Sequence, residues 1–87
     1  AEAMTKAAVE IGFDPKAAAM IARWTISGAG ALLESSDQPA DALRAAVTSK
    51  GGTTAAAVGV LDGCEVRDAF IRAITAARDR GVDLGQG

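Results

Sequence analysis

Residues 15–34 read PKAAAMIARWTISGAGALLE. The stretch is rich in alanine, the best helix former, and has no proline after its first position. Its hydrophobic residues surround the predicted helix instead of forming one stripe, so the helix needs cover on most sides. The rest of an 87-residue chain is too short to supply that cover, and we expect a second copy of the chain to do so. The small residues of the run 27–31 would let two helix backbones approach closely.

Helix start and stop signals flank this segment and recur along the chain. Asp14 and Pro15 form an N-cap followed by proline at the first helical position, and Gly12 is suited to end a helix over residues 2–11. The further predicted helices cover residues 39–46, 53–62 and 65–80, and the last two stop at Gly63 and Gly81. The predicted fold class is all-α, a small helical bundle of about five helices interlocked with a second copy as a dimer.

These signals describe one domain. We assign residues 1–82 to a helical dimerisation and substrate-loop domain, and residues 83–87 to a frayed C-terminal tail. The expected partner is a second copy of the chain, a homodimer formed through the helix 15–34. Whether such dimers assemble further is left open.

Composition excludes several classes of function. With a net charge of −2 the chain has no basic surface for nucleic acid, and we find no apolar run suited to a membrane span. There is no histidine and only one cysteine, so we expect no metal site and no internal disulfide. The start of the chain lacks a secretory signal, and we expect a cytoplasmic protein.

The loop Thr48-Ser49-Lys50-Gly51-Gly52-Thr53-Thr54 is the expected ligand site. It precedes a predicted helix, whose first N–H groups have no partner inside the helix and point outward with the positive end of the dipole. Gly51 and Gly52 leave no Cβ in the way of a ligand. The hydroxyl groups of the loop belong to Ser49, Thr53 and Thr54. Such a loop suits a small carboxylate or phosphate; the alternative is an ordinary helix start at which Ser49 or Thr53 caps its own backbone.

Residues 47–54, VTSKGGTT, strongly resemble the signature of the pyrroline-5-carboxylate reductases. The similarity extends over about residues 11–80 and includes the turns GFDP (12–15), LLES (32–35) with Pro39, and VLDG (60–63). Two places depart from the family. Lys50 stands where the family usually has proline, and CEV (64–66) replaces a Gly-Phe pattern before the last helix.

The resemblance implies the C-terminal domain of an oxidoreductase. Such enzymes reduce 1-pyrroline-5-carboxylate to L-proline, the last step of proline biosynthesis, with NADH or NADPH. The cofactor is held mainly by an N-terminal Rossmann domain, which is absent from this chain; the chain itself has no Gly-x-Gly-x-x-Gly motif. The helical domain interlocks with its partner and supplies the substrate loop. We therefore expect the 87 residues alone to be inactive, and the choice between NAD and NADP is not encoded in them.

The resemblance also implies roles for the loop residues. By motif position, Ser49 and the backbone N–H groups of Gly52, Thr53 and Thr54 would hold the substrate carboxylate, and Gly51 is counted with them among the substrate-binding residues. The Thr54 hydroxyl, the catalytic candidate, would face the ring nitrogen. Threonine is too weak an acid to protonate that nitrogen outright, so Thr54 is assigned orientation, and the proton comes from the iminium or from water. The competing hypothesis is a helical dimerisation module without chemistry.

Overall fold

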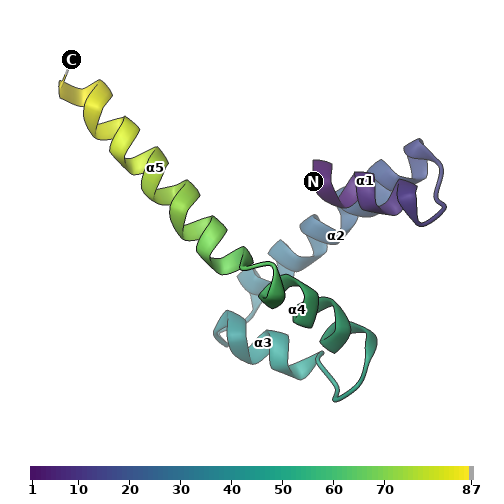
Figure 1. Ribbon diagram of the computed structural model, residues 1–87. Helices are drawn as coiled ribbons and strands as arrows, with labels where there is room; N and C mark the ends of the chain where they lie inside the picture. Colours follow the sequence, from purple (N-terminus) through teal and green to yellow (C-terminus); the bar gives the residue numbers. More distant parts are fainter. Residues whose placement is uncertain (87) are drawn as a thin grey trace. The chain divides into compact units, whose positions relative to one another are not determined.

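The computed structural model describes residues 1–86, which form five helices and contain no strand (Figure 1). The helices are α1 (Glu2–Glu10), α2 (Pro15–Ser35), α3 (Ala40–Ala46), α4 (Thr53–Gly63) and α5 (Val66–Gln86). The predicted all-α class is therefore confirmed. The chain divides within α3 into two compact units, residues 1–43 and the residues from Arg44 onward, and each is described by itself.

The start of α2 has the predicted cap. The Asp14 carboxylate accepts hydrogen bonds from the backbone N–H groups of Lys16 at 3.0 Å and Ala17 at 3.2 Å, and Pro15 occupies the first helical position. Proline gives up no bond there, because that N–H has no partner inside the helix. The cap fixes where the longest apolar segment of the sequence becomes helical.

The end of α1 is closed by the glycine that the sequence indicates. Gly12 has φ +119°, in the region that favours glycine. Its N–H donates to the Val9 carbonyl, and the Phe13 N–H donates to the Ala8 carbonyl, both at 3.1 Å. This pair of bonds is the Schellman arrangement, which satisfies carbonyls that the helix end leaves open. It turns the chain from α1 into α2.

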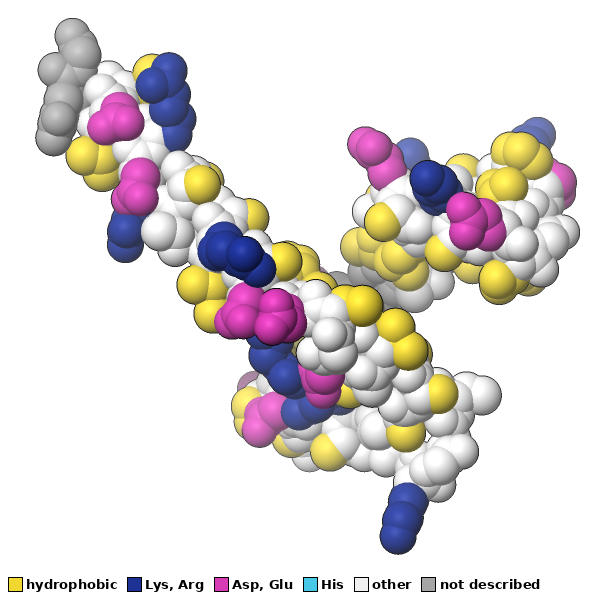
Figure 2. Space-filling view, viewed as in Figure 1, with side chains coloured by type: hydrophobic (Ala, Val, Ile, Leu, Met, Phe, Trp, Pro, Cys, Tyr) yellow, Lys and Arg dark blue, Asp and Glu magenta, His cyan; other side chains and the backbone are white. Residues whose placement is uncertain are grey.

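The interior of the first unit consists of alanine. α1 packs against α2, and the buried hydrophobic residues are Ala8, Ala18 and Ala22, of which Ala18 is fully buried. Alanine lets two helices come close but removes little apolar surface from water. The larger side chains of α2 remain exposed, Trp24 to 68%. Hydrophobic side chains are accordingly visible on the surface in Figure 2.

The second unit contains no buried residue among its described side chains. α4 contacts α5, and the junction passes through Glu65, whose φ of +57° is unusual for a residue other than glycine. An ion pair of 2.8 Å joins Arg67 to Asp62 across this junction. Phe70 and Ile74 of α5 are 64% and 66% exposed.

The predicted end of the last helix is wrong. α5 continues through Gly81 to Gln86, so residues 83–86, assigned to a frayed tail, are helical; residue 87 lies outside the described residues. Gly81 does not have the positive φ of a helix-ending glycine. A glycine inside a helix costs about 1 kcal/mol relative to alanine, which weakens a helix without obliging it to stop.

Within residues 1–86, no helix combines the length and the apolar character that crossing a lipid bilayer requires.

The contact of α1 with α2 can be tested by adding volume to it. We expect Ala18→Leu to lower the free energy of unfolding by about 1–3 kcal/mol, because the fully buried site has no room for three more carbon atoms. Ala7→Leu, at an exposed position of α1, is the matched control and is expected to change stability little. Urea unfolding at one fixed protein concentration measures both. Equal midpoints for the two variants would contradict this packing.

Candidate functional site

The loop between α3 and α4 is anchored to the last turn of α3. The Thr48 hydroxyl donates to the Arg44 carbonyl, and the Thr48 N–H donates to the Ala45 carbonyl at 3.2 Å. The Val47 N–H also donates to the Arg44 carbonyl, at 3.2 Å. Thr48 is half-buried. The loop therefore leaves α3 in a fixed direction before it reaches the residues predicted to bind a ligand.

Residues 49–52 form a tight turn. The Gly52 N–H donates to the Ser49 carbonyl at 3.0 Å, and Gly51 has φ +73°. Lys50 does not have a positive φ, since Glu65 is the non-glycine residue with one within residues 1–86. This combination is a type II turn, in which glycine suits the third position and proline is common at the second. Gly51 is thus required by the backbone, and Lys50 occupies the proline-type position.

Glycine is favoured at position 52 because the Ser49 side chain lies very close to it. Its backbone is extended, with φ −85° and ψ 179°, and it is the N-cap residue of α4. A Cβ placed on Gly52 would lie 2.5 Å from the Ser49 hydroxyl oxygen and 3.3 Å from the Ser49 carbonyl oxygen. The Ser49 side chain therefore occupies the space that a side chain at position 52 would fill, which places its hydroxyl beside the start of α4.

The first N–H groups of α4 have no acceptor. No side chain caps this helix, and the first backbone bond into it runs from the Ala56 N–H to the Gly52 carbonyl, at 3.1 Å. Within residues 1–86, the N–H groups of Thr53, Thr54 and Ala55 make no hydrogen bond. The alternative of a self-capped helix start is therefore not what the structure shows. The Gly52 N–H, expected to be free for a ligand, is used by the turn, and Ala55 is an open donor that the sequence analysis missed.

The hydroxyl groups beside these amides are also unpaired. Three other threonines, Thr5, Thr25 and Thr48, donate their hydroxyls to the carbonyl four residues earlier. By contrast, the hydroxyls of Ser49, Thr53 and Thr54 have no hydrogen-bond partner in the part of the chain that the structure describes. Ser49 and Thr53 are exposed, and Thr54 is half-buried. The loop thus brings together several donors that the protein does not use internally.

The electrostatic setting of α4 favours an anion. Its first turn has no acidic residue, whereas α1, α3 and α5 have one and α2 is capped by an aspartate. The positive end of the α4 dipole is therefore not neutralised by the protein. Lys50 is the one charged residue in the stretch 45–61, and its side chain is exposed.

The arrangement can bind but not carry out proton transfer by itself. Backbone N–H groups and hydroxyls donate to a carboxylate or phosphate, and a bond to a charged acceptor contributes roughly 1.5–3 kcal/mol. The loop has no carboxylate or imidazole to act as general acid or base. Among the described residues, no group of three His, Cys, Asp or Glu side chains is placed to hold a metal ion.

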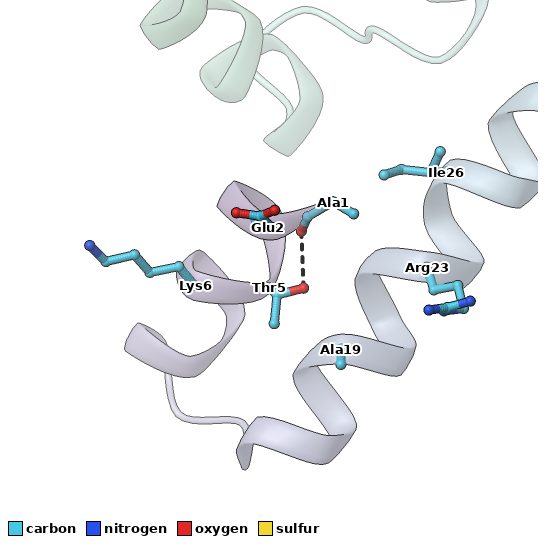
Figure 3. A pocket seen from close by; sticks show the side chains of 7 residues that line it. All are labelled: Ala1, Glu2, Thr5, Lys6, Ala19, Arg23 and Ile26. Carbon is cyan, nitrogen blue, oxygen red and sulfur yellow. Dashed lines mark hydrogen bonds between the residues drawn. The ribbon is translucent and has the colours of Figure 1, made fainter.

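A separate groove lies in the first unit, between the beginning of α1 and the middle of α2 (Figure 3). It has a volume of about 490 Å³ and is lined by Ala1, Glu2, Thr5, Lys6, Ala19, Arg23 and Ile26. In Figure 3 the Thr5 hydroxyl bonds the Ala1 carbonyl, and the Lys6 side chain extends away from α2. Although four of these residues are polar or charged, most of the surface exposed in the groove is apolar, so the groove resembles an uncovered packing surface more than a polar ligand site. No pattern in the sequence indicated this groove.

The sequence of this chain is similar to one family of known proteins. The sequence model described as "Pyrroline-5-carboxylate reductase dimerisation" matches residues 1–84. The chain is 35% identical over 85 residues to a pyrroline-5-carboxylate reductase of Corynebacterium melassecola, covering 98% of this chain and 32% of that protein. It is 40% identical over 85 residues to pyrroline-5-carboxylate reductase 3 of Danio rerio, covering 98% and 30%.

A third relative matches the chain with similar identity and coverage. The chain is 37% identical over 86 residues to a pyrroline-5-carboxylate reductase of Methanosarcina acetivorans, covering 98% of this chain and 32% of that protein. The chain thus spans about a third of the length of the curated relatives it matches. No solved structure matches it significantly.

The turn geometry predicts a stabilising substitution. Lys50→Pro is expected to raise the free energy of unfolding by about 0.4–1 kcal/mol, because proline suits the second position of a type II turn and restricts the unfolded chain. The Lys50 N–H donates no hydrogen bond within residues 1–86, so none is lost. Lys50→Ala is the control for removing the side chain. Chemical unfolding compares the three proteins, and a proline variant less stable than the alanine variant would contradict the turn assignment.

Proposed function

Because this chain belongs to the pyrroline-5-carboxylate reductase dimerisation family, we propose that it is the C-terminal part of an enzyme reducing 1-pyrroline-5-carboxylate to L-proline. In this proposal the chain supplies the dimer interface and the loop that holds the substrate carboxylate. The observation that carries it is the open start of α4, which has three unpaired N–H groups beside unpaired hydroxyls. Proline biosynthesis is the corresponding pathway.

The carboxylate would bind across the first turn of α4. The N–H groups of Thr53, Thr54 and Ala55 offer backbone donors at the positive end of the helix. The Ser49 hydroxyl, placed beside this turn by the absence of a side chain at Gly52, adds a further donor. The Gly52 N–H stays in the turn, so its role is to shape the cradle and not to contact the ligand.

Thr54 would orient the substrate ring. Its side chain is half-buried beside the open amides, and a ring held by its carboxylate could present its nitrogen to the Thr54 hydroxyl. Reduction adds a hydride to the imine carbon and leaves the nitrogen protonated. A threonine hydroxyl is too weak an acid to deliver that proton outright, so it fixes orientation through a hydrogen bond. The proton comes from the iminium form or from water.

The nicotinamide cofactor, NADH or NADPH, would supply the hydride. Residues 1–86 do not fit a dinucleotide site of the Rossmann type, since they contain no strand and the sequence has no Gly-x-Gly-x-x-Gly motif. We therefore place the cofactor mainly in a part of the protein outside this chain. A single unpaired cysteine, Cys64, is compatible with a reducing compartment, and the cytoplasm is the proposed location.

The proposed partner is a second copy of the chain, held through α2. The exposed side chains on this helix include large apolar ones, and burying each would contribute roughly 1.5–3 kcal/mol. Side chains of this kind on α2 are Met20, Ile21, Trp24, Ile26, Leu32 and Leu33. No atom beyond their own helix and chain neighbours lies within 4 Å of a Cβ built on Gly28 or Gly30, so this small-residue run is open to a facing helix.

The site assignment is tested by removing single hydroxyls from the full-length protein. Thr54→Ala is expected to lower kcat/KM for 1-pyrroline-5-carboxylate about two- to tenfold, the value of one neutral hydrogen bond. Thr54→Ser keeps the hydroxyl and is expected to retain most of the rate, while Ser49→Ala is expected mainly to raise KM. Oxidation of NADH and of NADPH is the measurement. Normal turnover with Ser49 and Thr54 both replaced by alanine would refute the site.

The α2 interface is tested with a charge at its tryptophan. Trp24→Glu in the full-length protein is expected to weaken the dimer at least tenfold, since interface tryptophans are often worth about 2 kcal/mol or more. Arg80→Glu, at an exposed position on α5, is the control for a changed surface charge. Sedimentation or light scattering across a dilution series measures the dissociation constant. An unchanged dissociation constant for the Trp24 variant would place the interface elsewhere. A parent protein that is monomeric at micromolar concentration would contradict the proposed dimer.

A non-catalytic dimerisation module is the competing function, favoured by the exposed apolar side chains on α2 and α5. The two functions differ in ligand binding. Calorimetric titration of the full-length protein with proline or a phosphate salt separates them. Binding is expected for the reductase and is not expected for a pure dimerisation module.

A further inference from the structure

We propose that the break between α4 and α5, at residues 64–65, is a conformational switch. The ion pair of Asp62 with Arg67 holds the break, and without that pair residues 53–86 form one continuous helix. The inference concerns the second unit alone and does not depend on the proposed reaction. It matters for any partner, because the direction of α5 decides where the exposed apolar side chains of this helix are presented.

The end of α4 is a weaker stop than the end of α1, which uses the same geometry. At α1 the residue with positive φ is Gly12, and two backbone bonds close the helix. At α4 this place is taken by Glu65, for which a φ of +57° carries a steric cost. Of the two closing bonds, the described part of the chain has one here, from the Glu65 N–H to the Asp62 carbonyl at 3.1 Å.

The sequence after the break does not oblige a helix to stop. Residues 64–80 contain no glycine or proline, whereas Pro15 follows soon after α1. The N–H groups of Val66, Arg67 and Asp68 have no acceptor within residues 1–86. In one helix through the break, each of them would donate to the carbonyl four residues earlier. Backbone hydrogen bonding therefore favours the continuous helix.

The ion pair opposes this preference, because its geometry requires the break. The Arg67 guanidinium lies 2.8 Å from the Asp62 carboxylate. In a continuous helix these two residues, five positions apart, would lie about 140° from each other around the axis. Side chains meet on a helix at a spacing of three or four residues, so the pair would separate. The break and the ion pair thus form and disappear together.

The two charges do not suit the helix ends on which they lie. Asp62 is in the last turn of α4, at the negative end of its dipole, and Arg67 is in the first turn of α5, at the positive end. Each is unfavourable there by itself, and both positions would be interior in a continuous helix. A strained residue persists where its surroundings hold it, and the second unit has no buried residue among its described side chains to do so. The pairing of these charges is therefore what holds Glu65 in place.

Hydrogen exchange at the start of α5 measures the two forms. The amides of Val66 and Asp68 are unpaired in the broken form and bonded in the continuous one. Exchange is read residue by residue in the full-length protein, relative to an unstructured peptide of the same sequence. We expect nearly unprotected amides in the parent and exchange about two- to fivefold slower in Arg67→Gln, the range that an exposed ion pair allows. About 1 M salt is expected to slow the parent in the same direction.

Three further variants make the result specific. Arg72→Gln removes an exposed arginine of α5 that bonds only within its own helix, and is expected to leave the exchange unchanged. Asp62→Arg combined with Arg67→Asp reverses the pair and is expected to keep the amides unprotected. Glu65→Gly removes the steric cost of the positive φ, so adding it to Arg67→Gln is expected to restore fast exchange.

Each outcome decides for or against the switch. Protected amides in the parent would show that the break is not the main form, and equal exchange in the parent and Arg67→Gln would show that the ion pair does not hold it. Both results would overturn the proposal. Amides inside α4 report whether a variant stays folded; if Arg67→Gln loses their protection, the parent in high salt decides, and unchanged exchange there would overturn the proposal as well.

Discussion

The fold depends on how little apolar surface this chain buries. In the part of the chain that the structure describes, the buried hydrophobic residues are three alanines, Ala8, Ala18 and Ala22, where α1 and α2 meet. Alanine permits a short distance between helices, yet the free energy gained from each buried methyl group is small beside that of leucine or phenylalanine. Conformational entropy opposes folding by about 1–2 kcal/mol per residue. A chain that leaves its tryptophan and both phenylalanines exposed needs another surface to cover them, and membership of a dimerisation family accords with that need.

The start of α4 also leaves groups without a partner in the described part of the chain, and these groups are polar. Helix starts are ordinarily closed by a side chain, as Asp14 closes α2. At α4 the sequence offers Ser49 and Thr53 as caps, and neither makes a capping hydrogen bond. Unpaired N–H groups are costly when buried, but these belong to residues in the first turn of α4 that are exposed or half-buried, so they cost little until a ligand displaces water. The arrangement keeps donors available without lowering stability much.

The sequence was sufficient wherever a local rule decides the structure. Asp14 and Pro15 start α2, and Gly12 closes α1, because capping and positive φ depend on neighbouring residues only. It failed where two local rules compete. Gly81 could end or interrupt α5, and the helix continued. At the α4–α5 junction the residue with positive φ is Glu65. Gly63, two positions earlier, could adopt a positive φ without a steric cost, but it does not.

The candidate site shows the same limit at the level of single atoms. The residues of the loop were predictable, because two glycines before a helix indicate exposed amides. Which amides stay free was not, because the turn takes the Gly52 N–H and leaves that of Ala55. The placement of the Ser49 hydroxyl over Gly52 likewise requires coordinates.

A site built largely from main-chain donors constrains the sequence in a particular way. Almost any residue carries the N–H groups that bind, so side-chain identity matters most where it sets backbone geometry, at Gly51 and Gly52. The remaining exposed side chains are then free to vary without disturbing the shape of the loop. Lys50 is an example, because the second position of the turn accepts many residues and its side chain is exposed. Shape is therefore set by the glycines and not by the side chain between them and Ser49.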